Sequence, residues 1–336
     1  MSLLFRKRPA GMIASMAALL GVVLLAGSFG PIRSFIQTVK PHHNSIITAL
    51  SERQAEEDRL MNWIVAEAAK QDQPPVNAVI DRVWKAIPGY DGRVVDVQAT
   101  YLKAKLIGTS PGAGQGFPWV YRTVKPKVAL TDLPLHPIYR GNPAKPMVAL
   151  MINVAWGDEY LGPMLEILRE ADVKATFFFD GTWLSKHMDV ARTIIAQGHE
   201  ASNHAYTHPA MSRLGAERQR EEIGKTEALL KQLGVRNVWF APPSGDYNAT
   251  TVKIASEFGL RTVLWTLDTV DWKNPEPASV VSKIGRNVGP GNLILMHPTA
   301  ASQGALKGMI EAIRAKGYRL GTVSETLSPE RLDVRL

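Results

Sequence analysis

The sequence predicts an α/β protein whose larger part is a distorted, incomplete (β/α) barrel, preceded by a small α/β domain and an N-terminal membrane helix. Three observations lead to this fold class. After residue 146, short apolar runs alternate with amphipathic stretches of helical period, which is typical of βαβ units around a parallel sheet. Polar clusters follow several of these runs, as they do at the carboxyl ends of barrel strands. At the N-terminus, an uncharged apolar stretch stands behind basic residues.

The first 32 residues form the predicted membrane segment. Arg6, Lys7 and Arg8 precede an uncharged and mostly apolar stretch that runs to residue 32. A membrane-spanning helix needs about 20 apolar residues, whereas a signal-peptide core has about 7–15, and the basic flank stays in the cytoplasm. Residues 1–32 are therefore expected to be a signal anchor that holds the protein outside the cytoplasm. The alternative is a signal peptide cleaved near residues 26–28, which would release a secreted protein.

Residues 33–122 are expected to fold as a small α/β domain, followed by a proline-rich connector at 123–146. Apolar residues at mixed three- and four-residue steps predict a first helix, which Pro74 and Pro75 end. The predicted elements are a helix at 45–71, strands at 76–80 and 94–97, and a second helix at 98–106. The connector contains five prolines, which exclude a regular helix and favour an extended chain.

The barrel domain is predicted over residues 147–330. Its strand candidates are the apolar runs at 148–153, 175–179, 238–241, 262–267, 293–296 and 319–323. Six or seven strand–helix units in about 190 residues are too few for a barrel of eight strands, so the barrel is expected to be incomplete.

Composition excludes several kinds of site. The chain contains no cysteine, so a bound metal must be held by histidine, aspartate, glutamate or asparagine. The net charge is +8, yet no basic run is interleaved with aromatic residues, and a nucleic-acid partner is not expected. The sequence does not determine the oligomeric state.

Candidate site residues follow the predicted strands. Asn153 ends the first strand, and Asp271 and His297 follow two later ones. His204 and His208 are four positions apart, which lets two imidazoles share one helical face or tight loop and bind one divalent cation. This spacing alone is weak support, because chance often produces it in a chain with eight histidines.

The order of the motifs resembles that of the polysaccharide deacetylases of carbohydrate esterase family four, which carry the NodB homology domain. The family has, in order, Thr-Phe-Asp-Asp-Gly, His-Ser/Thr-x-x-His, Arg-Pro-Pro-Tyr-Gly, Asp-x-x-Asp-Trp and Leu-x-x-His. The matching segments here are 152–158, 204–208, 241–245, 268–272 and 295–297. The stretch Asn-Val-Ala-Trp-Gly, together with Ala-Pro-Pro-Ser-Gly, is similar to the sporulation-associated YlxY-type subgroup.

The resemblance implies a divalent metal, expected to be zinc with cobalt or nickel as alternatives, held by an aspartate and by two histidines. His204 and His208 match those two histidines. It also implies that His297 protonates the departing amine, and Asp271 is expected to orient it, with Asp268 behind. The expected substrate-binding residues are Trp156, Pro243 and Trp272. Both tryptophans are equally well explained as core packing.

Two substitutions depart from the family pattern. Asn153 stands in the place of the catalytic base aspartate, and Ala241 in the place of the arginine that pairs with it. Loss of the carboxylate alone would leave a buried guanidinium unpaired, at a cost of about 3–5 kcal/mol, so the two losses are consistent with each other. An amide does not accept a proton at neutral pH, so base catalysis must come from another residue or be lost.

Asp158 is the expected replacement for the family's metal-binding aspartate, because Val154 occupies that position. If Asp158 binds the metal, Glu159 or Asp246 is the candidate base. If Asp158 is itself the base, Asn153 is a candidate ligand through its side-chain oxygen. A third interpretation gives Asp158 and Glu159 no role in the site, because acidic residues are favoured in the first turn of a helix.

The function expected from this sequence is metal-dependent N-deacetylation of an extracytoplasmic glycan, with peptidoglycan as the expected substrate. The alternative is a catalytically silent, deacetylase-like protein that binds glycan or acts as a wall scaffold, and Asn153 with Ala241 favours it. A third possibility is a sugar-modifying barrel in which a metal is purely structural.

Overall fold

The computed structural model describes residues 30–332, and these residues form two compact units. The smaller unit consists of the described residues up to Gln71 together with Val95–Tyr121, and the larger unit contains the rest. Residues 72–94, which the sequence analysis assigned to the small N-terminal domain, therefore group with the larger unit.

The smaller unit is built on two helices, α2 (Gly30–Gln71) and α3 (Val97–Leu106). Helix α2 has 42 residues, so it begins well before the predicted start at residue 45 and ends at the predicted residue. Leu60 and Ile64 of α2 pack with Ala104 and Phe117 in a small apolar cluster. Among residues 30–332, no helix is long and apolar enough to cross a bilayer. The predicted membrane segment lies, up to residue 29, outside the described residues.

Two pairs of short strands precede the parallel sheet. Strand β1 (Val79–Asp81) pairs antiparallel with β2 (Lys85–Ile87), and β3 (Gly92–Val95) pairs with β4 (Tyr121–Val124). The prolines of the following segment keep it free of long helix, as predicted, and the short 3-10 helix η2 (Leu130–Asp132) interrupts it.

A parallel sheet of eight strands follows, and its strands run in chain order β5 (Met147–Val154), β6 (Thr176–Phe179), β7 (Glu200–Asn203), β8 (Trp239–Phe240), β9 (Arg261–Thr262), β10 (Leu267–Asp268), β11 (Leu293–Met296) and β12 (Arg319–Gly321). Their spatial order is β10-β11-β5-β6-β7-β8-β9, with β12 beside β5. Strands β9 and β10 stand at opposite ends of this order, yet only residues 263–266 connect them. The sheet must therefore curl until its edges approach, which confirms the expected α/β fold with an incomplete barrel.

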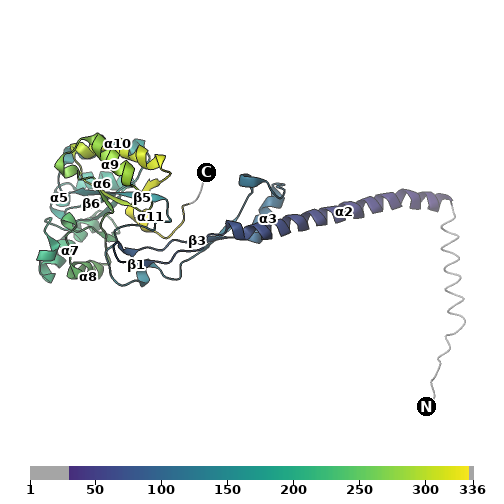
Figure 1. The fold of residues 1–336 in the computed structure, drawn as a ribbon, viewed down its shortest axis with the longest axis horizontal. Coiled ribbons are helices and arrows are strands. Elements are labelled where there is room, and N and C mark those ends of the chain that lie inside the picture. Colours follow the sequence, from purple (N-terminus) through teal and green to yellow (C-terminus); the bar gives the residue numbers. More distant parts are fainter. Residues whose placement is uncertain (1–29, 333–336) are drawn as a thin grey trace, which may run out of the picture. The chain divides into compact units, whose positions relative to one another are not determined.

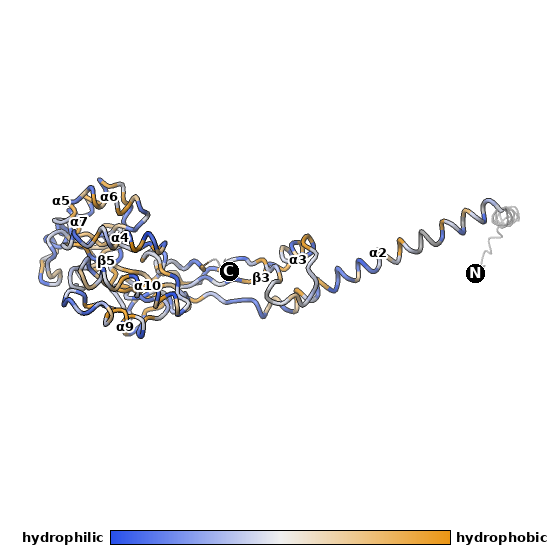
Figure 2. The backbone as a smooth tube through the Cα atoms, turned by 90° about the horizontal axis from the view of Figure 1, so that it is seen from above, coloured by the Kyte–Doolittle hydropathy of each residue, from blue (hydrophilic) through white to orange (hydrophobic). Residues whose placement is uncertain are grey.

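Helices surround the curled sheet, as Figure 1 shows. They are α4 (Asp158–Glu170), α5 (Gly181–Lys186), α6 (Met188–Ala196), α7 (Ala216–Gln232), α8 (Ala249–Glu257), α9 (Pro277–Asn287), α10 (Ala300–Ala315) and α11 (Val323–Leu327). All eight residues of β5 are buried, which explains why its sequence is a continuous apolar run without alternation. Figure 2 shows hydrophobic residues gathered around β5 and α10.

Two strands differ from the prediction. Strand β7 was not predicted, because its sequence Glu-Ala-Ser-Asn lacks an apolar run. The predicted strand at 262–267 is in fact the end of β9 and the beginning of β10, with irregular chain between them. Both differences lie at strands that border the candidate site.

Candidate functional site

A pocket of about 390 Å³ lies at the carboxyl ends of the parallel strands. Its lining comprises Asn153, Trp156, His204, His208, Ser244, Trp265, Asp268, Trp272, Leu295 and His297. These residues lie in or follow the last part of β5, β7, β8, β9, β10 and β11, so strand ends far apart in the sequence meet at one place. This is the position where parallel α/β sheets and barrels bind their ligands.

His204 is a buried, neutral imidazole with one nitrogen fixed. It follows β7 directly, and its backbone N–H donates to the carbonyl of Phe179 at 2.9 Å. Its Nδ1 lies 2.7 Å from the carbonyl oxygen of Ala241, which can only accept, so Nδ1 carries the proton and Nε2 has a free lone pair. Burial, together with the nearby His208, lowers the pKa of His204 to about 3.

His208 completes the histidine pair. Its ring centroid lies 5.1 Å from that of His204, with an angle of 67° between the ring planes. Burial lowers the pKa of His208, while the negative charge of Asp180 opposes this shift. The structure thus brings together the two histidines that the i, i+4 spacing selected.

Sequence reasoning missed Asp180, a buried residue after β6 whose Oδ2 has no hydrogen-bond partner.

His297 and Asp271 form a second pair on the other side of the pocket. Asp271 Oδ1 lies 2.8 Å from Nδ1 of His297, and Asp271 Oδ2 accepts a hydrogen bond from the His297 backbone N–H at 2.5 Å. Ser302 also donates its hydroxyl to Oδ2. Burial by itself would raise the pKa of Asp271, but the hydrogen bonds from His297 and Ser302 outweigh it, and the net pKa is lowered. Asp271 is thus a buried carboxylate that orients His297, whereas Asp268 lines the pocket instead of lying behind Asp271.

Asn153 and Ala241 stand where the resemblance places the base and its arginine. Asn153 is buried at the end of β5, lines the pocket, and its Oδ1 has no hydrogen-bond partner. Ala241 is also buried, and its carbonyl is the acceptor that fixes His204. Position 241 therefore contributes to the site through its backbone carbonyl and not through a charged side chain.

Asp158 does not reach the histidine pair, contrary to the role expected for it. Its Oδ1 accepts a hydrogen bond from Nε1 of Trp183, and its Oδ2 lies 3.2 Å from Nε2 of His187. The reason is the turn before it. Gly157 has a φ of 86°, and a Cβ at this position would lie 2.0 Å from the carbonyl oxygen of Pro298. This close approach turns the chain directly into α4.

Glu159 is exposed in the same helical turn and does not line the pocket. Asp158 and Glu159 are the acidic residues of the first turn of α4, where the helix dipole favours negative charge. Asp246, the other candidate base, accepts hydrogen bonds from the backbone N–H and the hydroxyl of Ser212, at 2.7 and 2.8 Å. The geometry thus supports a structural role for all three carboxylates.

Aromatic side chains form the walls of the pocket. Trp156 stacks on His297 with ring centroids 5.3 Å apart and an interplanar angle of 14°, and it meets His208 edge-on. Trp272 is more than half exposed, and the Lys273 ammonium lies 4.9 Å from the centre of its ring. Pro243, the third expected substrate residue, is buried and does not line the pocket. Trp265 does line it, and was missed because it lies inside a segment predicted as strand.

The donor set does not fit the metal site that the resemblance implies. Within residues 30–332, no group of three histidine, cysteine, aspartate or glutamate side chains is placed to hold a metal ion. His204 and His208 supply two imidazoles, and the unpartnered Oδ1 of Asn153 adds only a neutral amide. The carboxylate of the expected set is missing from this group of donors.

Comparisons with known proteins agree with this geometry. The model of the polysaccharide deacetylase family matches residues 140–263. The uncharacterized protein YlxY of Bacillus subtilis is 42% identical over 304 residues, which cover 89% of this chain and 94% of that protein. A peptidoglycan-N-acetylglucosamine deacetylase of Bacillus cereus is 32% identical over 185 residues, covering 53% of this chain and 67% of that enzyme.

Among solved structures, a CE4 family pseudoenzyme from Bacillus anthracis has a TM-score of 0.77 and 42% identity, covering 82% of this chain and 97% of that one. A mutant of this pseudoenzyme is described as having restored enzymatic activity. The likeness extends well beyond the residues that the family model matches.

Proposed function

The chain belongs to the polysaccharide deacetylase family, and from this membership we propose that it binds an N-acetylated cell-wall glycan, with peptidoglycan as the expected form, without deacetylating it efficiently. The single observation that carries the proposal is the buried amide of Asn153 at the position of the family's catalytic base. General base catalysis contributes typically about 10²–10⁴-fold to a reaction rate, and an amide does not supply it at neutral pH.

Neither Asp158 nor Glu159 replaces the base. Asp158 is held by Trp183 and His187, and Glu159 is exposed outside the pocket. The proposal is further supported by the Bacillus anthracis relative, which is called a pseudoenzyme. The match with that protein covers 82% of this chain, so we propose that low deacetylase activity is common to both proteins.

The shape of the pocket favours a sugar ligand. Trp156 and Trp272 present partly exposed indoles at its rim, and flat aromatic faces pack well against the apolar face of a pyranose ring. Several relatives are named peptidoglycan deacetylases, which supports a cell-wall glycan as the ligand. In this proposal the chain acts outside the cytoplasm, held by its N-terminal segment or secreted after cleavage, and a role in sporulation rests on the similarity to the YlxY subgroup.

A metal-dependent deacetylase, using zinc or a similar divalent ion, is the second candidate function. One observation favours it: the pair of His297 and Asp271 is complete, with Nδ1 of the imidazole oriented at 2.8 Å by the carboxylate. A histidine held in this way is suited to protonate a departing amine. The pair is equally compatible with a binding protein descended from an enzyme.

Release of acetate separates the two functions. The wild-type protein and the double variant Asn153→Asp with Ala241→Arg are incubated with acetylated peptidoglycan or chitotetraose, with and without added Zn²⁺ or Co²⁺. We expect acetate release by the double variant to be about 10²-fold or more above that by wild type, because the variant regains a proton acceptor and its counter-charge. Binding of chitotetraose to wild type, measured by calorimetry, is expected in both the presence and the absence of metal.

The opposite outcome is equally clear. Metal-dependent acetate release by wild type that disappears in His297→Ala would show that the protein is a deacetylase and would overturn the proposal. If wild type binds neither peptidoglycan nor chitotetraose, the proposed glycan ligand is wrong, whether or not the double variant releases acetate.

A further inference from the structure

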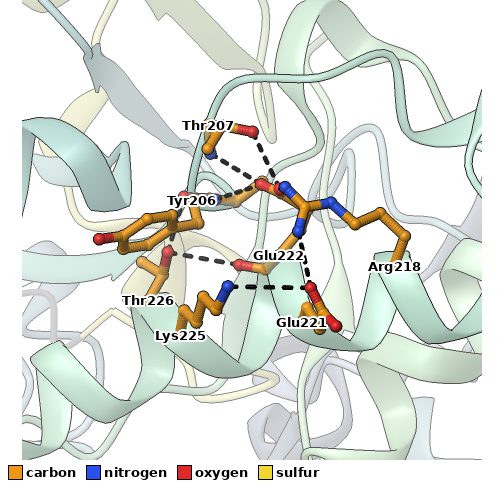
Figure 3. A network of polar contacts seen from close by, with 8 residues as sticks. Tyr206, Thr207, Arg218, Glu221, Glu222, Lys225 and Thr226 are labelled. Carbon is orange, nitrogen blue, oxygen red and sulfur yellow. Dashed lines mark hydrogen bonds and ion pairs between the residues drawn. The ribbon is translucent and has the colours of Figure 1, made fainter.

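A buried glutamate holds the loop that carries the histidine pair. Glu222 lies in α7 and is 1% exposed. Its Oε2 accepts hydrogen bonds from the backbone N–H groups of Tyr206 and Thr207, at 3.0 and 2.7 Å. Its Oε1 accepts from the Thr207 hydroxyl and from the guanidinium of Arg218, both at 2.9 Å. Figure 3 shows this network, in which one carboxylate pairs with four donors.

The loop needs such support because of its backbone. Ala205 and His208 have φ values of 62° and 55°, a left-handed conformation that residues with a side chain rarely adopt. The carbonyl of Ala205 accepts from the N–H of Gly181 at 2.9 Å and from the Thr226 hydroxyl at 2.7 Å. The N–H of Ala205 donates to the side chain of Asn203 at 2.8 Å. Unusual backbone angles persist where the surroundings fix them in this way.

The ring of Tyr206 packs the loop tightly against its neighbours. A Cβ at Gly181 would lie 2.2 Å from a carbon of this ring, so only glycine fits there. The ammonium group of Lys225 lies 5.7 Å from the centre of the ring. The loop that ends at His208 is therefore held by hydrogen bonds and by packing.

We propose that Glu222 is the positioning residue of the histidine pair. By binding the two N–H groups immediately before His208, it sets that imidazole at 5.1 Å and 67° from His204. Glu222 itself does not line the pocket, so it acts through the loop and not on the ligand. The pocket thereby keeps a defined arrangement of two imidazoles even though the base position holds an amide.

The charge of the carboxylate is essential to this role. All four partners of Glu222 are donors, so both of its oxygens must accept. In Glu222→Gln, one oxygen becomes an NH₂ group that faces donors, and half of the network is lost. The loop must then move, and His208 moves with it.

The test is a spectroscopic comparison of free protein variants. Long-range ¹H–¹⁵N spectra report the ring nitrogens of each histidine, including tautomer and hydrogen bonding. In Glu222→Gln we expect displaced ring signals for His208 and unchanged signals for His199, which packs elsewhere. Glu221→Gln is the matched control: Glu221 is the neighbouring residue and pairs with the same Arg218 at 2.6 Å, but it makes no contact with the loop in Figure 3. Its histidine signals should equal those of wild type.

A merely structural role gives a different result. If Glu222→Gln lowers the melting temperature but leaves the ring signals of His208 in place, the proposal is wrong. Should this variant not fold, Thr207→Val removes one donor without changing a charge, and Thr207→Ser restores the hydroxyl. Displacement of the His208 signals in Thr207→Val and its reversal in Thr207→Ser supports the proposal, and identical spectra for the two variants overturn it.

A second readout connects the network with ligand binding and rests on the proposed function. Glu222→Gln is expected to bind chitotetraose about tenfold more weakly than Glu221→Gln, a loss comparable to one misplaced hydrogen bond. If wild type does not bind chitotetraose, the proposed function fails, whereas the ring signals of the free protein still decide the role of Glu222. If Glu222→Gln and Glu221→Gln bind chitotetraose equally and the ring signals of His208 do not move, Glu222 does not position the histidine pair.

Discussion

His199 shows how burial determines the protonation of a single residue in this domain. It is 5% exposed, and its Nδ1 accepts a hydrogen bond from the backbone N–H of Ala175 at 3.2 Å, which only an unprotonated nitrogen can do. Burial, with the nearby Lys174, lowers the pKa of His199 to about 4. In the unfolded chain His199 takes up a proton near pH 6.5, whereas in the folded protein it stays neutral until about pH 4. The contribution of neutral His199 to stability is therefore complete above pH 6.5 and is lost as the pH falls toward 4.

This linkage predicts a measurable acid sensitivity. Urea unfolding at pH 7.5 and pH 4.5 should show a free energy of unfolding that falls, with His199 contributing roughly 2–3 kcal/mol of the decrease. In His199→Gln the contribution of His199 to this decrease is absent, and the contributions of the other titratable groups remain. An identical pH dependence in wild type and variant would show that folding does not lower the pKa of His199.

The candidate site was predictable from sequence where a residue's role depends on its own motif. His204 and His297 follow β7 and β11 directly, so the end of the strand sets the direction of each side chain, and Asp271 and His208 come three and five positions after β10 and β7. Asp158 was assigned to the histidine pair, but its direction depends on Gly157 meeting Pro298, a contact across 141 positions of the chain. Such a contact has no local pattern. Trp265 was missed because its segment was predicted as strand, whereas Asp180 follows β6 directly, a position that the strand-end pattern could have selected.

At the scale of elements, Asp158 belongs to the start of α4, and this predicts the effect of removing it. Asp158→Ala loses the hydrogen bond from Trp183 and the contact with His187, together with a favourable charge near the helix N-terminus. We expect a loss of about 1 kcal/mol, or a melting temperature lower by about 2–4 °C, measured by calorimetry. Affinity for chitotetraose and for Zn²⁺ should not change.

Glu159→Ala is the matched control for this prediction, because it removes an acidic residue from the same helical turn without removing those two contacts. A large loss of Zn²⁺ affinity in Asp158→Ala alone would restore Asp158 as a metal ligand and contradict the placement seen in this structure.

The sheet was predictable wherever its strands are apolar on both faces. Strands β5, β6 and β11 are entirely buried, so each appears in the sequence as a continuous apolar run. Strand β7 is also mostly buried, but its Ser202 and Asn203 are satisfied by hydrogen bonds to Trp239, Asn237, Ile223 and Glu227. Because tertiary partners replace apolar burial there, the strand has no sequence signature.

At the scale of the whole molecule, the C-terminal residues connect distant parts of the larger unit. Lys145 is 2% exposed, and its ammonium donates to the carbonyls of Glu325 and Ser328, at 2.5 and 2.8 Å. Burial lowers its pKa to about 8. The carbonyl of Pro329 accepts from the N–H of Asp91 at 2.7 Å, and Arg331 donates back to the carbonyl of Asp91 at 3.0 Å. These contacts explain why residues 72–94 group with the barrel and not with the smaller unit.

Removing these residues should therefore weaken the barrel itself. In a variant that ends at Leu327, Lys145 keeps one of its two acceptors and Asp91 loses both backbone partners. At about 1–3 kcal/mol for each unsatisfied buried group, we expect a melting temperature lower by roughly 5–10 °C, with faster hydrogen exchange at the N–H of Asp91. A variant that ends at residue 332 is the control, because it keeps every one of these contacts. If both variants melt at the same temperature and Asp91 exchanges equally in the two, residues 328–332 do not hold this segment, and its place in the larger unit rests on its other contacts, such as the hydrogen bonds of Pro88 with Asn142 and of Ala86 with Pro137.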